Sequence, residues 1–167
     1  MFKVSVIASL ITLSAAIAAT PAQAINLVNG GFETGNLTGW TENGALAISS
    51  VPNLGAFSAV FFSNSSEPAT LSQTLSGFTV GNEYQLSFFL NTQGQIPNGL
   101  TASVGGVEFL TLTNITTTGF PNYTANFTAS STSETLTFSG FNDQDASFLD
   151  DISVTAVGAT PRDSCTL

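Results

Sequence analysis

The stretch Glu83–Asn91, which reads EYQLSFFLN, carries the clearest secondary-structure signal of the sequence. Every second residue from Tyr84 to Leu90 is apolar, and this alternation places those side chains on one face of an extended strand. No stretch beyond residue 24 keeps a helical spacing of apolar residues over several turns. Shorter alternating stretches recur instead, at 57–63, 69–75, 107–113, 123–128, 136–138 and 148–156. The pattern predicts an all-β protein.

Residues that favour turns separate the alternating stretches. They are Asn43-Gly44, Pro52-Asn53, Gly81-Asn82, Pro97-Asn98-Gly99, Gly105-Gly106 and Gly119-Phe120-Pro121. Glycine, proline and asparagine adopt the backbone angles that tight turns need. Roughly eight to ten short strands at this spacing predict an antiparallel β-sandwich, with the jelly roll as its expected form.

The first residues have the features of a cleavable secretory signal. Lys3 supplies the positive charge, residues 4–19 are apolar or small, and Ala22-Gln23-Ala24 has the small-x-small pattern of a cleavage site. The apolar run is too short and too rich in alanine and serine for a membrane anchor, which is the alternative interpretation. We therefore expect a signal peptide over 1–24 and a secreted protein, either extracellular or periplasmic.

The rest of the chain has the length of a single domain. We expect one jelly-roll domain over 25–157, and a disordered tail over 158–167, where no pattern is visible. A second apolar run is absent, so we expect no membrane span in the mature chain.

Charge and composition narrow the functions that the chain can have. The sequence contains 2 Lys and Arg residues, 11 Asp and Glu residues and no histidine, for a net charge of −9. Binding to nucleic acid or to an anionic membrane needs a basic surface, so these partners are not expected. The absence of histidine argues against Ser-His-Asp and Cys-His catalysis and against the usual zinc sites. The single cysteine cannot form an intrachain disulfide.

Four segments resemble a known family. Asn26–Trp40 reads NLVNGGFETGNLTGW, and it resembles the opening of galactose-binding-like jelly rolls, in particular carbohydrate-binding modules of the four/nine type. Similar openings occur in exported bacterial proteins with a PEP-CTERM sorting tail, and we expect this chain to be related to that group but without the tail. The resemblance implies that the domain over 25–157 is carbohydrate-binding-like. The segments LSQTL (71–75), YQLSF (84–88) and FLDDISV (148–154) resemble later strands of the same family. The resemblance implies a secreted, non-catalytic module that recognises an extracellular or envelope polysaccharide.

The last of these segments contains a candidate metal ligand. Strict alternation places Asp150 on the same face as Phe148 and Ile152, where a carboxylate is costly unless it is paired or binds a metal. The resemblance implies a structural calcium ion with Glu33 and Asp150 among its ligands. The alternative is that Asp150 accepts backbone N–H groups while Glu33 is solvated.

Aromatic rings and nearby amides are the candidate ligand-binding residues. The pairs Phe61-Phe62 and Phe88-Phe89 each put one ring on each face of a strand, and the outward ring could line a sugar groove. Core packing of all these rings is the alternative, and the resemblance likewise favours a core position for Trp40 over a sugar platform. The predicted ligand-binding residues are Phe61, Phe89, Asn91 and Gln93.

Two other functions are open to such a chain. One is a structural matrix or surface protein without a small ligand. The other is a glycoside hydrolase that uses Glu108, Asp143 or Asp145, because that reaction needs two carboxyl groups at a defined separation. An acidic turn in solvent is the simpler interpretation of Asp143 and Asp145, and we do not expect an enzyme.

Overall fold

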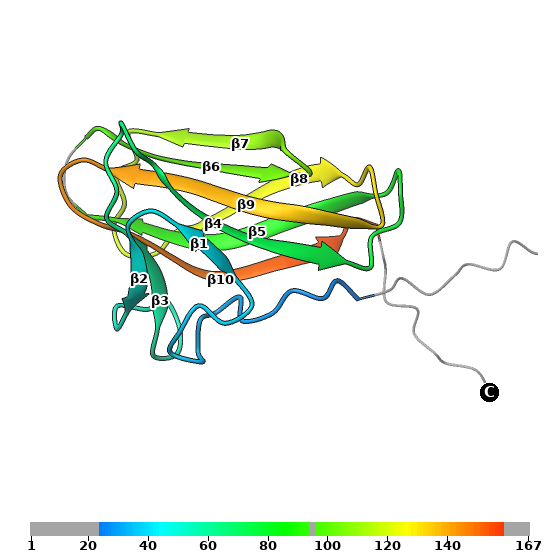
Figure 1. Ribbon diagram of the computed structural model, residues 1–167, viewed down its shortest axis with the longest axis horizontal. Helices are drawn as coiled ribbons and strands as arrows, with labels where there is room; N and C mark the ends of the chain where they lie inside the picture. Colours follow the sequence, from blue (N-terminus) through cyan, green and yellow to red (C-terminus); the bar gives the residue numbers. More distant parts are fainter. Residues whose placement is uncertain (1–23, 94–95, 159–167) are drawn as a thin grey trace, which may run out of the picture.

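The computed structural model describes residues 24–93 and 96–158, and ten β-strands and no helix occur in this part of the chain. Figure 1 shows their arrangement. The strands are β1 (Thr41–Asn43), β2 (Leu46–Ser49), β3 (Ser58–Phe61), β4 (Ala69–Ser76), β5 (Glu83–Thr92), β6 (Asn98–Val104), β7 (Val107–Thr113), β8 (Asn122–Thr128), β9 (Ser133–Asn142) and β10 (Ser147–Ala156). The predicted signal and tail lie outside the described residues, except for Ala24 and Gly158.

The strands form two five-stranded sheets that face each other (Figure 1). The first sheet has the order β1-β4-β9-β6-β7 and the second has the order β2-β3-β10-β5-β8. Every pair of neighbouring strands is antiparallel. The prediction of an antiparallel β-sandwich of the jelly-roll kind is therefore confirmed.

One predicted turn is wrong. Asn98 and Gly99 were expected in a turn, but they begin strand β6. The buried Asn98 side chain explains the difference: its Nδ2 donates to the Ile115 carbonyl at 2.9 Å, and its Oδ1 accepts the Ile115 N–H at 2.7 Å. These two hydrogen bonds pair both main-chain groups of Ile115 beside the strand. The Asn98 side chain therefore stabilises the sheet, and Asn98 does not form a turn.

The core lies between the two sheets. Alternation along β5 turns Leu86, Phe88 and Leu90 inward, and none of them is exposed. The facing positions of the first sheet include Leu71 and Phe138, which are also fully buried. The outward positions of β4 and β9 are mostly serine and threonine. The predicted face of the Glu83–Asn91 stretch is thus confirmed as the core face.

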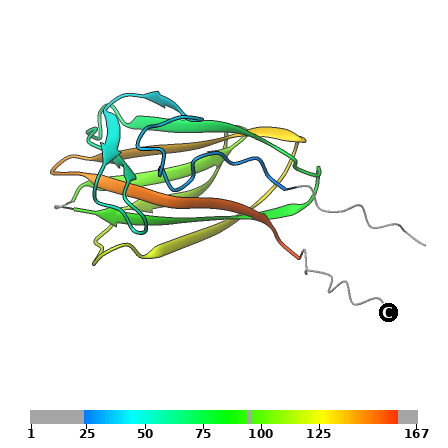
Figure 2. The ribbon, with the colours of Figure 1, turned by 90° about the horizontal axis from the view of Figure 1, so that it is seen from below.

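The segment before β1 closes one open side of the sandwich, where Figure 2 shows it running between the sheets. The Gly30 carbonyl accepts the Ile152 N–H at 2.9 Å, and the Gln73 amide bonds both main-chain groups of Val28. Phe32 from this segment is fully buried. The segment therefore joins β4 of the first sheet to β10 of the second.

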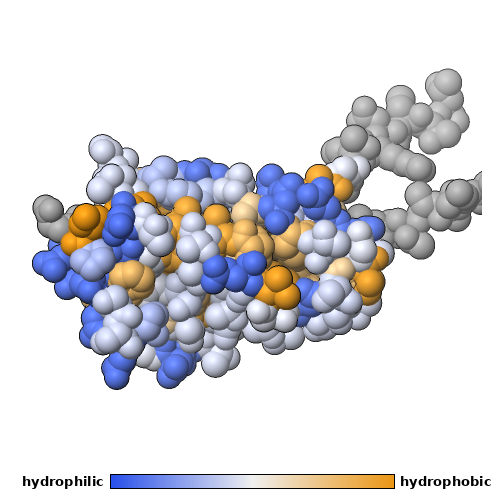
Figure 3. Space-filling model, turned by 90° about the horizontal axis from the view of Figure 1, so that it is seen from above, coloured by the Kyte–Doolittle hydropathy of each residue, from blue (hydrophilic) through white to orange (hydrophobic). Residues whose placement is uncertain are grey.

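The opposite open side lies between the edge strands β7 and β8. Figure 3 looks onto this side and shows a strip of hydrophobic residues between more hydrophilic ones. The half-buried apolar residues of the two edge strands that pack against the core are Phe109, Leu110, Leu112 and Tyr123. Among residues 24–93 and 96–158 there is no helix long and apolar enough to cross a membrane.

Candidate functional site

Asp150 occupies a bulge in β10. The register with β5 shifts after Asp150, and Asp151 has a φ of 48°. The prediction that Phe148, Asp150 and Ile152 share one face is therefore wrong. The bulge turns Ile152 to the core, whereas Phe148 and Asp150 pair with outward positions of β5. Asp150 is nevertheless fully buried, because the loop 50–57 covers it.

The Asp150 carboxylate fastens that loop to the sheet. Its Oδ2 accepts the Asn53 N–H at 2.8 Å, and its Oδ1 accepts the Asp151 N–H at 2.7 Å. Burial raises the pKa of Asp150 to about 6, because desolvation of the charged form outweighs the stabilising amide hydrogen bonds. No lysine, arginine or histidine occurs in the described part of the chain. No protein cation is therefore available there to compensate the buried charge.

Glu33, the other predicted metal ligand, holds the far end of the same loop. Its carboxylate accepts the Ala56 N–H at 3.0 and 2.9 Å and the Phe57 N–H at 3.0 Å. The structure thus brings Glu33 and Asp150 to one loop, each with backbone N–H partners. This arrangement matches the alternative interpretation for Asp150, and it shows a role for Glu33 that the sequence did not suggest.

The neighbourhood of Gly31 has oxygen donors that suit a hard cation. A Cβ placed on Gly31 would lie 3.3 Å from Asp151 Oδ1, 4.0 Å from Asp150 Oδ1 and 3.9 Å from Glu33 Cγ. Carboxylate oxygens are the ligands that calcium prefers, so the donor chemistry fits. Within residues 24–93 and 96–158, however, no three His, Cys, Asp or Glu side chains form a group that could hold a metal ion. Protein carboxylates alone would not complete a calcium site here.

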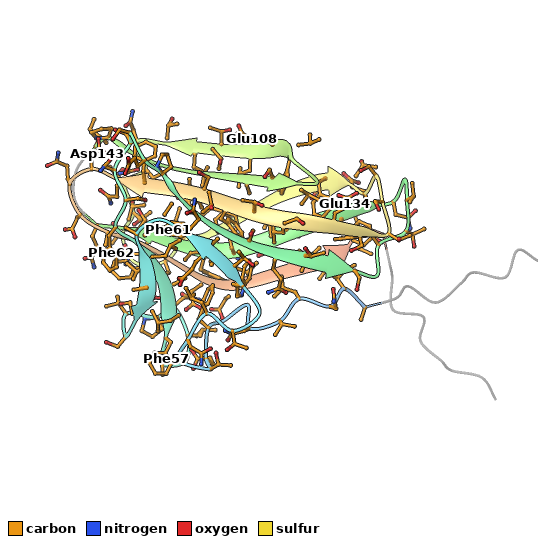
Figure 4. The ribbon with its side chains drawn as sticks, in the orientation of Figure 1. Phe57, Phe61, Phe62, Glu108, Glu134 and Asp143 are labelled. Carbon is orange, nitrogen blue, oxygen red and sulfur yellow. The ribbon has the colours of Figure 1, made fainter. Side chains whose placement is uncertain are left out.

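A second candidate region is a hollow of about 390 Å³ at one end of the sandwich, which we call the Phe62 hollow. The turn between β1 and β2 forms one wall, and the loop between β3 and β4 forms the other. Its lining residues are Asn43, Gly44, Ala45, Phe62, Ser63, Asn64, Glu67 and Pro68. Figure 4 labels Phe62 and Asp143 at this end of the molecule.

Hydrogen bonds fix both walls of the hollow. The Phe62 N–H donates to the Ala45 carbonyl at 3.0 Å, which joins the two walls. Ser63 is buried, and its hydroxyl donates to the Gly140 carbonyl at 2.7 Å while it accepts the Ala69 N–H at 2.9 Å. Because these groups are already paired, the hollow is formed before any ligand arrives.

Two side chains shape the loop that carries the far wall. Asn64 Oδ1 accepts the backbone N–H groups of Ser66 and Glu67, both at 3.1 Å. Asp143 accepts a hydrogen bond from the Ser65 N–H and another from the Ser65 hydroxyl, the latter at 2.7 Å. The acidic turn before β10 is therefore an anchor for the loop between β3 and β4. No local pattern predicts this pairing, because the partners are 78 positions apart.

The predicted ligand-binding residues separate onto two faces. Phe61 is fully buried in the core, which corrects its assignment as a ligand residue, and the outward ring of that pair is Phe62. Phe89, Asn91 and Gln93 lie at alternate positions on the outer side of β5 and beyond its end. Asn91 accepts a hydrogen bond from the Thr117 hydroxyl at 3.0 Å, and the Gln93 side chain is exposed.

Trp40 has a structural role, as the resemblance suggested. It is 8% exposed, and its ring centroid lies 5.9 Å from that of Phe32 and 6.4 Å from that of Phe138. Its Nε1–H donates to the Asn29 carbonyl at 3.1 Å. A ring that is buried and hydrogen-bonded in this way cannot be a sugar platform.

The candidate hydrolase acids are not gathered into one site. Glu108 lies on β7 and accepts a hydrogen bond from the nearby Thr111 hydroxyl. Figure 4 shows it well away from Asp143 at the end of the molecule. Asp143 and Asp145 are exposed, and the Asp143 carboxylate already accepts a hydrogen bond from the Ser65 hydroxyl. None of these three acids lines the Phe62 hollow.

Solved structures share this fold, although no protein-family model and no curated protein matches the chain. TmCBM61, solved with β-1,4-galactotriose, matches with a TM-score of 0.61 and 22% identity over 78% of this chain and 97% of that chain. The CBM22-1 xylan-binding domain of Xyn10C from Paenibacillus barcinonensis matches with a TM-score of 0.62 and 18% identity, over 85% and 100% of the two chains.

A third match is the enzymatically active domain of tailspike protein 4 from bacteriophage CBA120. Its TM-score is 0.63 at 13% identity, over 81% of this chain but only 22% of that chain. At such identities the likeness establishes the fold. The chain is a jelly-roll β-sandwich of the architecture found in carbohydrate-binding modules.

Proposed function

We propose that this protein is a secreted, non-catalytic carbohydrate-binding module for an extracellular or envelope polysaccharide. The match to TmCBM61 carries the proposal, because a module solved with a galactan oligosaccharide is covered over nearly its whole length. The pre-formed Phe62 hollow and the secretory features of residues 1–24 support it. The four/nine type and the relation to PEP-CTERM proteins rest on the sequence segments 26–40, 71–75, 84–88 and 148–154 alone.

Direct binding of polysaccharides tests the proposal. The secreted chain is run through native gels that contain soluble polysaccharides, and retardation is compared with an inert control protein. We expect slower migration in at least one glycan, without release of reducing ends. Migration that no glycan changes, together with self-association on purification, would instead support the matrix protein.

We also propose a structural calcium ion between the opening segment and the bulge in β10. Support comes from the buried, uncompensated Asp150, the neighbouring Asp151 and the space on the Cβ side of Gly31. Main-chain carbonyls and water would complete the six to eight oxygen ligands that calcium prefers. Glu33 would join only if its carboxylate released the amides of Ala56 and Phe57.

Thermal unfolding with and without calcium tests this ion. A ligand that binds only the folded state stabilises it by about 2.7 kcal/mol at one hundred times its Kd. We expect calcium, and not an equal concentration of magnesium, to raise the melting temperature of the wild type. Asp150→Asn is expected to lose this shift. An equal response of wild type and variant would contradict the site.

A further inference from the structure

Phe62 differs from the other apolar residues on the surface. Of the large hydrophobic side chains that are exposed in the described part of the chain, it is the one aromatic, and 54% of it is accessible. Its neighbour in the sequence, Phe61, is by contrast fully buried. Phe62 therefore exposes an aromatic ring to solvent directly after strand β3, at a position where a polar residue would be more usual.

The ring adjoins groups that can bond to hydroxyls. Asn43, Asn64 and Glu67 line the same hollow. Asn64 uses its Oδ1 to hold the loop, but its Nδ2 makes no hydrogen bond within the described residues. The Glu67 carboxylate also makes none there. One aromatic ring with an amide donor and a carboxylate acceptor beside it suits a sugar, which has apolar C–H faces and a rim of hydroxyls.

The negative charge of the domain restricts the kind of sugar that the Phe62 hollow can bind. Ten of the eleven acidic side chains, and neither of the two basic ones, lie in the described part of the chain. Glu67 lines the hollow and Asp143 anchors its wall. A uronate or sulfate would meet like charges here and no cation among the described residues, and such repulsion is strongest at low salt.

We infer that the Phe62 hollow binds one uncharged sugar unit of a polysaccharide, with its C–H face on the Phe62 ring and its hydroxyls on Asn64 and Glu67. The inference rests on the proposed function and adds to it the place of binding and the class of ligand. It also moves the site from the β5 residues Phe89, Asn91 and Gln93 to the loops at the end of the sandwich.

Variants of exposed residues test the inference in the secreted chain. The probes are neutral polysaccharides (β-1,4-galactan, β-1,4-xylan and a β-glucan) and anionic ones (polygalacturonate and alginate), measured by affinity electrophoresis and calorimetry. Phe62→Ala is paired with Val80→Ala, because Val80 is similarly exposed at 57% and lies outside the hollow. Glu67→Gln is paired with Glu108→Gln, because both carboxylates are exposed and only the first lines the hollow.

We expect the wild type to bind a neutral probe and no anionic one. Phe62→Ala is expected to weaken binding about tenfold or more and Glu67→Gln about threefold, with both controls unchanged. Circular dichroism and the melting temperature check that each variant is folded. Binding that survives Phe62→Ala would overturn the site, and binding to anionic probes alone would overturn the ligand class. Both results would leave the proposed function intact, whereas a wild type that binds no probe would remove both.

Discussion

Loops 50–57 and 62–68 flank strand β3, and both are fastened by carboxylates that accept backbone N–H groups. Asp150 holds the first loop from a fully buried position, whereas Asp143 holds the second from the surface. Loss of a buried acceptor leaves amides without a partner, whereas water can replace an exposed one. The first loop is therefore expected to support the stability of the domain, whereas the second shapes the Phe62 hollow, where we infer that a sugar binds.

Replacement of the buried anchor has the largest expected effect. Asp150→Ala leaves the N–H groups of Asn53 and Asp151 without their acceptor and is expected to lower the free energy of unfolding by about 2–4 kcal/mol. Urea denaturation at neutral pH measures the change. Asp145→Ala, which removes an exposed aspartate, is the control and is expected to change stability by less than about 0.5 kcal/mol. Equal effects of the two variants would contradict the comparison.

The pH dependence of stability tests the same anchor. The pKa of Asp150 rises from 3.8 to about 6 on folding, so in this window the folded state binds a proton that the unfolded state has released. The contribution of Asp150 to the free energy of unfolding is therefore greatest below the unfolded pKa. It falls as the pH rises through the window and is lost above the folded pKa. Urea midpoints across this range are expected to show a fall for the wild type that Asp150→Asn lacks. The same pH dependence in the wild type and in Asp150→Asn would contradict the raised pKa of Asp150.

Loss of Glu33 is expected to have an intermediate effect, because this exposed carboxylate holds the same loop, 50–57, as the buried Asp150. Glu33→Ala removes the acceptor of two backbone N–H groups and is expected to cost about 1 kcal/mol. Glu42→Ala is the matched control, since Glu42 is exposed on the short strand β1. Calorimetric melting compares the two variants, and a Glu33 variant as stable as the control would show that the loop does not need this anchor.

Loss of the surface anchor is expected to affect ligand more than stability. Asp143→Ala removes the acceptor of the Ser65 hydrogen bonds and is expected to lower the free energy of unfolding by less than about 1 kcal/mol. It is expected to weaken binding of a neutral glycan about threefold, because the wall of the Phe62 hollow must then be ordered on binding. Ser65→Ala is expected to behave alike. Unchanged calorimetric affinity in both variants would separate this loop from the binding site.

The smallest effect is expected at Glu108, which lies on neither loop. Glu108→Gln is expected to change stability by less than about 0.5 kcal/mol and to leave glycan binding as it is. A reducing-sugar assay over prolonged incubation is expected to show no turnover by the wild type. Hydrolysis that this variant abolishes would revive the glycosidase hypothesis.

Alternation predicted most of the strands because the core lies between two sheets and each strand turns every second residue toward it. Strand β5 follows the rule over its whole length. The rule failed at β10, where the αL conformation of Asp151 inserts a bulge and reverses the faces beyond it. Nothing local in the sequence marks that residue, since aspartate tolerates αL without requiring it.

The candidate site was predictable only in part. Adjacent rings at Phe61 and Phe62 predicted one inward and one outward side chain, but alternation cannot say which is which when both are phenylalanine. The pairing of β3 with β10 decides it, and that pairing joins residues almost ninety positions apart. The anchoring of Ser65 by Asp143 depends on the same long-range assembly.

The absence of basic side chains from the described residues has a consequence for the surroundings that the domain tolerates. Its carboxylates are held by main-chain amides, such as those of Asn53, Ala56 and Ser130, and not by lysine or arginine. Added salt therefore screens repulsion among the acids without weakening any ion pair in this part of the chain. High salt is therefore expected to raise the free energy of unfolding of this domain rather than lower it. This response would suit the secreted protein that we propose.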